Sequence, residues 1–424
     1  MRRAAALVVA VAVLAGCTAT PGEEAAVGET TTSPPSTTPQ FPEGTATDSA
    51  SAESATTTTT VAPSTTSTST TSTTTTTTTT TTLVPPDGLT AAERTLEQVT
   101  VIGGTISPKS VVASGTGLFF AQNMMYRHTV TVYDRSYELV ATIPDDVDLG
   151  ALGFAGYEGR YQGAPVEAAF TSDGAFAYVS NYEMYGAGRR TGAGDSCSPG
   201  QWQDSFVYRI DAEALGIDRA IPVGAVPKYL ALTPDDRLLV VSNWCSYDLS
   251  VVDLARDREV ARIDIGRYPR GIAISPDSST AYVAVMGSNR VAVVDLETLA
   301  VVDELVVGSS PRHLVLSPEG DVLYVSLNRE GRLAKVDLAT GEVLAKVATG
   351  VAPRSMDISD DGTALYVVNY ESGTMSKVRT ADMVETQELG AGYHPIGITY
   401  DAATREVWVS AYGGTITVFV DTAP

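Results

Sequence analysis

The chain has 424 residues, 43% of them hydrophobic, and its 50 acidic and 28 basic side chains give a formal net charge of −22 at pH 7. Its length permits one large or two small domains. So acidic a chain, with no basic run beyond its first residues, disfavours non-specific nucleic-acid binding, which depends on neutralising phosphates. We therefore expect no nucleic-acid partner.

Residues 1–17 have the organisation of an export signal. Arg2 and Arg3 precede an apolar run at residues 4–13 that is too short to remain in a bilayer as a spanning helix. The following Leu14-Ala15-Gly16-Cys17 resembles the lipobox of bacterial lipoproteins. That resemblance implies a lipidated Cys17 and an extracytoplasmic protein anchored to the cell membrane, and the alternative is an ordinary secretory signal with a chance cysteine.

Residues 18–88 are dominated by Thr, Ser, Pro, Ala and Glu, with unbroken Thr from 73 to 82. A segment of this composition cannot bury enough apolar surface to offset the entropy of ordering. We expect a disordered tether with a coil dimension of roughly 50 Å, whose composition also suits an O-glycosylated stalk.

From residue 89 to 424 the sequence is organised by a repeat. Five anchor prolines follow one another at intervals of 42 residues: Pro227, Pro269, Pro311, Pro353 and Pro395. Each is followed by short apolar runs separated by Gly, Pro, Asp and Ser, which is typical of strands joined by tight turns. Four strands in about 42 residues indicate a blade of a β-propeller.

Two further anchors, Pro108 and Pro165, extend the repeat upstream and make seven blades. The last unit has only three strands, near residues 396–400, 406–410 and 415–420. Residues 96–103 look like the missing fourth strand. We therefore predict an all-β, seven-bladed β-propeller in which an N-terminal strand closes the last blade and leaves no open edge.

The second strand of four units carries a shared tetrapeptide about 13 residues after the anchor proline. The four are Tyr178-Val179-Ser180-Asn181, Tyr282-Val283-Ala284-Val285, Tyr324-Val325-Ser326-Leu327 and Tyr366-Val367-Val368-Asn369. They resemble the YVTN-repeat (YncE-like) family of seven-bladed β-propellers, which includes exported bacterial proteins, archaeal surface-layer proteins and relatives of lactonase-type propellers. The resemblance covers nearly all of residues 96–420 and indicates a fold more firmly than a function.

The first two units are longer than the rest, with spacings of 57 and 62 residues. The additions fall at about residues 145–163, between a fourth strand and the next first strand, and at about 182–204, between a second and a third strand. Such connections emerge on one side of a propeller, so both insertions are expected on the same face, where loops on a rigid scaffold commonly form binding sites.

A basic residue follows the anchor proline in five of the seven units. If the first strands line the channel, these residues surround its mouth and form a site for a carboxylate, a phosphate or an acidic glycan. The alternative is that each pairs with an acidic residue such as Asp253, Asp295 or Asp337. The five are Lys109, Lys228, Arg270, Arg312 and Arg354.

Further ligand-binding candidates belong to the same face. Seventeen residues after the anchors stand Tyr182, Trp244, Tyr370 and Tyr412, which either stack on a ligand or pack over a neighbouring blade. His394 precedes an anchor and is a weaker candidate. Cys197 and Cys245 are predicted to form a disulfide in an oxidising compartment, rather than a metal site or a catalytic thiol.

Catalytic patterns are scarce. The chain has three histidines and no nucleophile elbow, phosphate-binding loop or zinc signature, so we assign no catalytic residue, metal or cofactor. We predict a monomeric binding or scaffold module at the cell envelope, whose partner is a protein, a glycan or a small anionic ligand. The alternative is a lactonase-like hydrolase or lyase, with His313 and His394 converging with Glu167 and Asp357 near the channel.

Overall fold

The computed structural model describes residues 87–192, 194–198 and 200–424. The interpretations of residues 1–17 as a lipoprotein leader and of 18–86 as a tether lie outside the described residues. The described chain is made of strands apart from two short 3-10 helices, η1 (Ala91–Glu93) and η2 (Gly194–Ser196). In this part of the chain no helix combines the length and the apolar character that crossing a bilayer requires.

Seven antiparallel sheets of four strands, here called blades 1 to 7, make up the fold. Blade 1 contains β2 (Ser110–Ala113), β3 (Leu118–Asn123), β4 (Thr129–Asp134) and β5 (Leu139–Pro144), and blade 2 contains β8 (Pro165–Phe170), β9 (Phe176–Asn181), β10 (Asp204–Asp211) and β11 (Gly216–Ala225). Blade 3 contains β12 (Pro227–Leu232), β13 (Leu238–Asn243), β14 (Asp248–Asp253) and β15 (Arg258–Asp264). Blade 4 contains β16 (Pro269–Ile274), β17 (Thr280–Val285), β18 (Arg290–Asp295) and β19 (Ala300–Val306). Blade 5 contains β20 (Pro311–Leu316), β21 (Val322–Leu327), β22 (Arg332–Asp337) and β23 (Val343–Ala348). Blade 6 contains β24 (Pro353–Ile358), β25 (Ala364–Asn369), β26 (Thr374–Arg379) and β27 (Val384–Gly390). Blade 7 contains β28 (Pro395–Asp401), β29 (Glu406–Ala411), β30 (Thr415–Thr422) and β1 (Thr95–Ile102).

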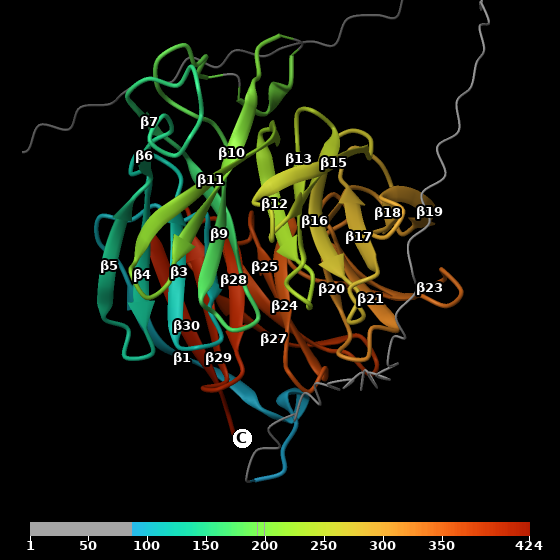
Figure 1. Cartoon of the computed structure of the whole chain (residues 1–424). Coiled ribbons are helices and arrows are strands. Elements are labelled where there is room, and N and C mark those ends of the chain that lie inside the picture. Colours follow the sequence, from blue (N-terminus) through green and yellow to red (C-terminus); the bar gives the residue numbers. More distant parts are fainter. Residues whose placement is uncertain (1–86, 193, 199) are drawn as a thin grey trace, which may run out of the picture. The chain divides into compact units, whose positions relative to one another are not determined.

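The blades form a closed ring (Figure 1). Each first strand contacts the first strands of both neighbouring blades, and the series returns from β28 to β2. The first strands are therefore innermost and the fourth strands outermost. The predicted seven-bladed β-propeller is confirmed, and each predicted anchor proline from Pro165 onward begins a first strand.

The apolar core lies between the blades rather than within any one of them. One buried cluster joins Val240 and Val251 of blade 3 to Ile272 and Val283 of blade 4, and comparable clusters join the other neighbouring blades. Outer strands such as β19 are largely exposed. A blade therefore buries its faces only against its neighbours, which is why the repeat is stable as a ring.

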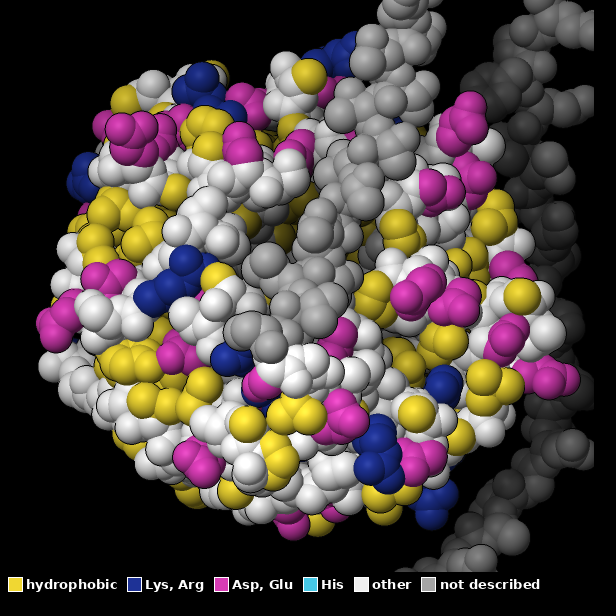
Figure 2. All heavy atoms as spheres, turned by 90° about the horizontal axis from the view of Figure 1, so that it is seen from below, with side chains coloured by type: hydrophobic (Ala, Val, Ile, Leu, Met, Phe, Trp, Pro, Cys, Tyr) yellow, Lys and Arg dark blue, Asp and Glu magenta, His cyan; other side chains and the backbone are white. Residues whose placement is uncertain are grey.

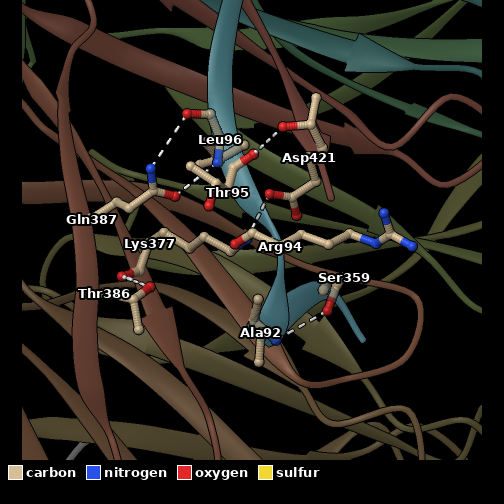
Figure 3. Close-up of polar contacts among 12 residues, drawn as sticks. Ala92, Arg94, Thr95, Leu96, Ser359, Lys377, Thr386, Gln387 and Asp421 are labelled. Carbon is tan, nitrogen blue, oxygen red and sulfur yellow. Dashed lines mark hydrogen bonds and ion pairs between the residues drawn. The ribbon is translucent and has the colours of Figure 1, made fainter. Parts of the chain in front are cut away.

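The N-terminal strand closes blade 7 as predicted. β1 pairs antiparallel with β30, from Thr95 opposite Thr422 to Ile102 opposite Ile416. Beneath this junction, Lys377 Nζ lies 2.5 Å from Asp421 Oδ1 and donates to the Arg94 carbonyl at 3.0 Å. Figure 3 shows these three residues together. The junction thus combines strand pairing with a buried ion pair.

Both insertions lie on one face, as predicted. The first contains the hairpin β6 (Asp146–Asp148) and β7 (Arg160–Gln162), and the second lies between β9 and β10. Gln162 of the first forms a β-bridge with Tyr185 of the second, and the Tyr161 hydroxyl donates to the Ala187 carbonyl at 3.0 Å. We call this side the insertion face.

The described chain begins on the opposite face (Figure 1). There Ala91 N of η1 donates to the Asp361 carboxylate at 2.7 Å, in the turn between β24 and β25. On the visible part of this face, Lys and Arg side chains are dispersed among acidic, apolar and uncharged ones (Figure 2). It shows no concentration of basic side chains outside the part that grey atoms cover.

Candidate functional site

The backbone of the repeat brings two residues of each blade to one corner of the insertion face. In blades 3 to 7, the residue before the anchor proline is left-handed, and its carbonyl accepts the N–H of the residue seventeen positions after that proline. Just after the proline, the pairing of the first and second strands shifts register. Because a bulge redirects side chains, the basic residue at this point turns toward the channel mouth.

The five basic residues form one cluster, which we call the cation ring. Lys109, Lys228, Arg270 and Arg312 are buried, and Arg354 is half-buried. Arg270 lies near each of the other four basic side chains of the ring. Burial lowers the pKa of these four, and the charge of Arg270 lowers it further. Arginine keeps its proton in proteins, so for the guanidinium groups the lowered pKa measures an electrostatic cost in the free protein.

Most of this charge lacks a direct counter-charge. In the described ranges, Lys109, Arg270, Arg312 and Arg354 have no carboxylate within 4.0 Å, and the buried Nε of Arg354 has no hydrogen-bond partner. Within the described part of the chain, the guanidinium of Arg312 has one polar contact, the Met286 sulfur at 3.8 Å. Buried charges are normally paired, because removing them from water is costly. The described residues therefore leave most of the positive charge of the cation ring without a directly bound carboxylate.

Aromatic side chains fill the spaces between the cations. The Lys228 Nζ lies 4.1 Å from the Tyr182 ring centre, and the Arg354 Cζ lies 3.3 Å from that of Tyr370. Arg270 lies over Trp244 at 5.8 Å. These cation–π contacts orient the basic groups without neutralising them.

Among the described residues, the second insertion supplies the one carboxylate in direct contact with the cation ring. Asp195 of η2 lies 2.5 Å from Lys228 Nζ and accepts the Tyr182 hydroxyl at 3.0 Å. Its carbonyl accepts Trp244 Nε1 at 3.3 Å. Two residues later, Cys197 is joined to Cys245, which confirms the predicted disulfide and fixes the insertion to blade 3.

Below the cation ring the channel contains a polar cavity of about 130 Å³. Glu167, Tyr229, His313 and Asp357 contribute to its wall. Burial raises the pKa of Glu167, against the effect of nearby Lys109, and raises that of Asp357 to about 6. Burial, together with the cations above, lowers the pKa of His313 to about 3, so its imidazole is neutral.

The ion-pair partners of the cation ring and the position of His394 differ from the sequence predictions. The proposed partners Asp253, Asp295 and Asp337 are wrong, because they bind turn residues of their own blades, such as Thr298 and Thr340. Lys228 forms an ion pair with Asp195 of the second insertion instead.

His394 does not join His313 in the channel. Its ring is stacked between Tyr370 at 4.1 Å and Tyr393 at 3.9 Å, with Nε2 3.6 Å from Glu371. Tyr412 lies beside the cation ring, where Arg270, Arg354 and Arg312 oppose the rise that burial causes in its pKa. His394 is therefore at the rim of the mouth and Tyr412 within it.

Comparison with known proteins supports the fold and gives little information on function. The family model described as "Cytochrome D1 heme domain" matches residues 310–395, which are blades 5 and 6 and the start of blade 7. Kuenenia stuttgartiensis hydrazine synthase is similar in structure, with a TM-score of 0.60 and 19% identity over 77% of this chain and 99% of that one. No curated protein matches.

The residues present do not fit a heme. A heme iron needs an axial His, Cys, Met or Tyr ligand. The cavity beside His313 holds about 130 Å³, less than the roughly 300 Å³ of a small ligand pocket. His394 is outside that cavity, and its Nε2 faces Glu371 at 3.6 Å. We therefore derive no chemistry through such a group.

Proposed function

We propose that this protein is an extracytoplasmic binding module that holds an anionic ligand in the cation ring. The observation that carries the proposal is the convergence of Arg270, Arg312 and Arg354 without a carboxylate in ion-pair distance among the described residues. A ring of cations that served only the fold would be paired or exposed. Binding sites commonly hold charges in arrangements that are unfavourable until the ligand arrives.

The proposal includes membership of the YVTN-repeat family. Its support is the position of Tyr178, Tyr282, Tyr324 and Tyr366, each at the third residue of a second strand. These tyrosines pack in or against the clusters between blades. A repeated structural role of this kind accounts for a repeated tetrapeptide.

The proposed lipid anchor at Cys17 lies N-terminal to the propeller in the sequence. The described chain enters the propeller on the face opposite the insertions (Figure 1). The insertion face is therefore not the face at which the described chain begins. An envelope protein or a glycan presenting an anionic group could approach from that side, as could a small free anion.

A hydrolase or lyase remains the second candidate. The observation in its favour is the pair of buried carboxyls with raised pKa values, Glu167 and Asp357, in the wall of one cavity. Perturbed carboxyls in a cavity are typical of acid–base chemistry. The cavity of about 130 Å³ ranks this candidate second, because it admits only a few non-hydrogen atoms.

The proposed function is tested by measuring anion binding to the purified protein. Calorimetry and thermal unfolding with sulfate, succinate and citrate, at constant ionic strength set with NaCl, should show saturable binding and stabilisation. Arg312→Gln should abolish both effects, and Arg354→Gln serves if that variant does not fold. Arg379→Gln is the matched control, because Arg379 is exposed and paired with Asp382. Wild-type protein that binds none of these anions would refute the proposal.

A further inference from the structure

The charges around the mouth define what kind of anion would balance them. Five basic side chains form the cation ring, and among the described residues the carboxylates that act on it are Asp195, Glu167 and, through Arg354, Glu371. If all eight groups are ionised, two positive charges remain without a counter-charge. A ligand with one negative charge would leave half of this excess in place.

The uncompensated charges are close together. Arg270, Arg312 and Arg354 follow the anchor prolines of three consecutive blades, and Arg312 has its pKa lowered by Arg270 and Arg354 after burial. Tyr412 adds a hydroxyl beside all three. Guanidinium groups and a phenol together offer several donors to the oxygen atoms of carboxylate, sulfate or phosphate groups.

Asp195 marks a second position for an anionic group. Its carboxylate contacts Lys228 Nζ and the Tyr182 hydroxyl, although its side chain is 62% exposed while that of Lys228 is only 7% exposed. Its backbone is held separately, through Trp244 Nε1 and the nearby disulfide. The carboxylate can therefore leave Lys228 by side-chain rotation into solvent, without movement of the insertion.

We infer that the ligand carries two or more negative charges and that one of its anionic groups replaces the Asp195 carboxylate on Lys228. This inference rests on the proposed function. In the free protein, Asp195 then acts as an internal competitor that partly neutralises the site. The remaining anionic groups of the ligand bind among the three arginines. The ligand class is a compact polyanion, such as a di- or tricarboxylate or a sulfate- or phosphate-bearing group.

The test compares ligand charge and the presence of Asp195. Binding of acetate, sulfate, succinate and citrate is measured by calorimetry at pH 6.5 and constant ionic strength, with wild type and Asp195→Asn. Wild type should bind the polyvalent anions about tenfold or more tightly than acetate. Asp195→Asn should tighten binding of the polyvalent anions by about tenfold, because the competing carboxylate is gone.

Asp382→Asn is the matched control, because it removes one exposed, ion-paired carboxylate far from the mouth and should leave affinity within about twofold. Acetate binding as tightly as succinate would overturn the charge assignment, and unchanged or weaker binding in Asp195→Asn would overturn the displacement. In both cases the proposed function would stand. Absence of binding by every anion to both proteins would instead refute the proposed function itself.

Discussion

Arg312 has an environment that folding alone does not explain. It is 7% exposed, lies near Arg270 and Arg354, and has only a methionine sulfur as a polar contact among the described side chains. We predict that Arg312→Met raises the free energy of unfolding of the free protein by about 1 to 2 kcal/mol, because it removes an unpaired buried charge at similar volume. Urea unfolding measures this change.

The same Arg312→Met variant should lose its stabilisation by sulfate. Arg379→Met, which alters an exposed arginine paired with Asp382, should change neither quantity. A loss of stability in Arg312→Met would mean that the arginine has a structural role and would count against a ligand site.

Lys228 makes anion binding depend on pH. Burial, together with nearby Arg270 and Arg312 and against the effect of Asp195, lowers its pKa to about 7 in the free protein. Only the protonated amine attracts an anion, so sulfate affinity should fall as the pH rises above 7, by about tenfold over one to two units. Sulfate keeps its charge throughout this range. The other groups facing Lys228 are Tyr182, whose pKa is raised by burial, and Trp244.

Lys228→Arg should remove the decline, because arginine remains charged at these pH values. Without a ligand, the free energy of unfolding of the wild-type protein should instead rise as the pH increases above 7. Between pH 7 and about 10.5 the unfolded chain binds a proton that the native Lys228 does not, so the burial penalty, complete below pH 7, diminishes as the pH rises. A sulfate affinity that stays constant from pH 6 to 9 in wild type would contradict the assigned role of Lys228.

At the scale of elements, the second insertion depends on its disulfide. Cys197 and Cys245 are 48 residues apart in sequence, and cross-linking a loop of that length stabilises by about 4 kcal/mol in the chain-entropy model. We predict that the double variant Cys197→Ser, Cys245→Ser loses up to about this much stability, measured by urea unfolding. Hydrogen exchange should increase first around residues 194–205. Wild type treated with a reductant should match the variant.

Sequence reasoning was effective where the repeat applies, and in the second insertion it predicted the disulfide but missed Asp195. The anchor spacing predicted the blades, the closing strand and the placement of Arg354 and Tyr370 on one face, because each blade repeats the same backbone geometry. Asp195 lies in an insertion with no counterpart in other blades, so no periodicity indicated it. Its position two residues before Cys197 was the available signal, since a disulfide to Cys245 brings that segment beside Trp244.

At the scale of the propeller, the cation ring and the beginning of the described chain are on opposite faces. The insertions and the cation ring lie on one side, and η1 contacts the turn of blade 6 on the other (Figure 1). Ligand binding at the mouth therefore need not disturb the strand that closes blade 7. The closure itself is the feature on which the whole ring depends, because a propeller without it has two free edges.

The closing junction should fail when its buried ion pair is broken from one side. Lys377 and Asp421, which Figure 3 shows, are both fully buried. The Tyr366 hydroxyl also donates to Asp421. We predict that Asp421→Ala lowers the free energy of unfolding by about 3 to 5 kcal/mol, because it leaves the Lys377 ammonium buried without a counter-charge. Lys377→Met combined with Asp421→Leu should recover most of that loss, because no buried charge remains. Urea unfolding of Lys377→Met, of Asp421→Leu and of the double variant, together with wild type, gives the coupling energy. A double variant that is less stable than Asp421→Ala would contradict this expectation. It would mean that the ion pair contributes more than the cost of burying its two charges, and that its geometry is required for β1 to pair with β30.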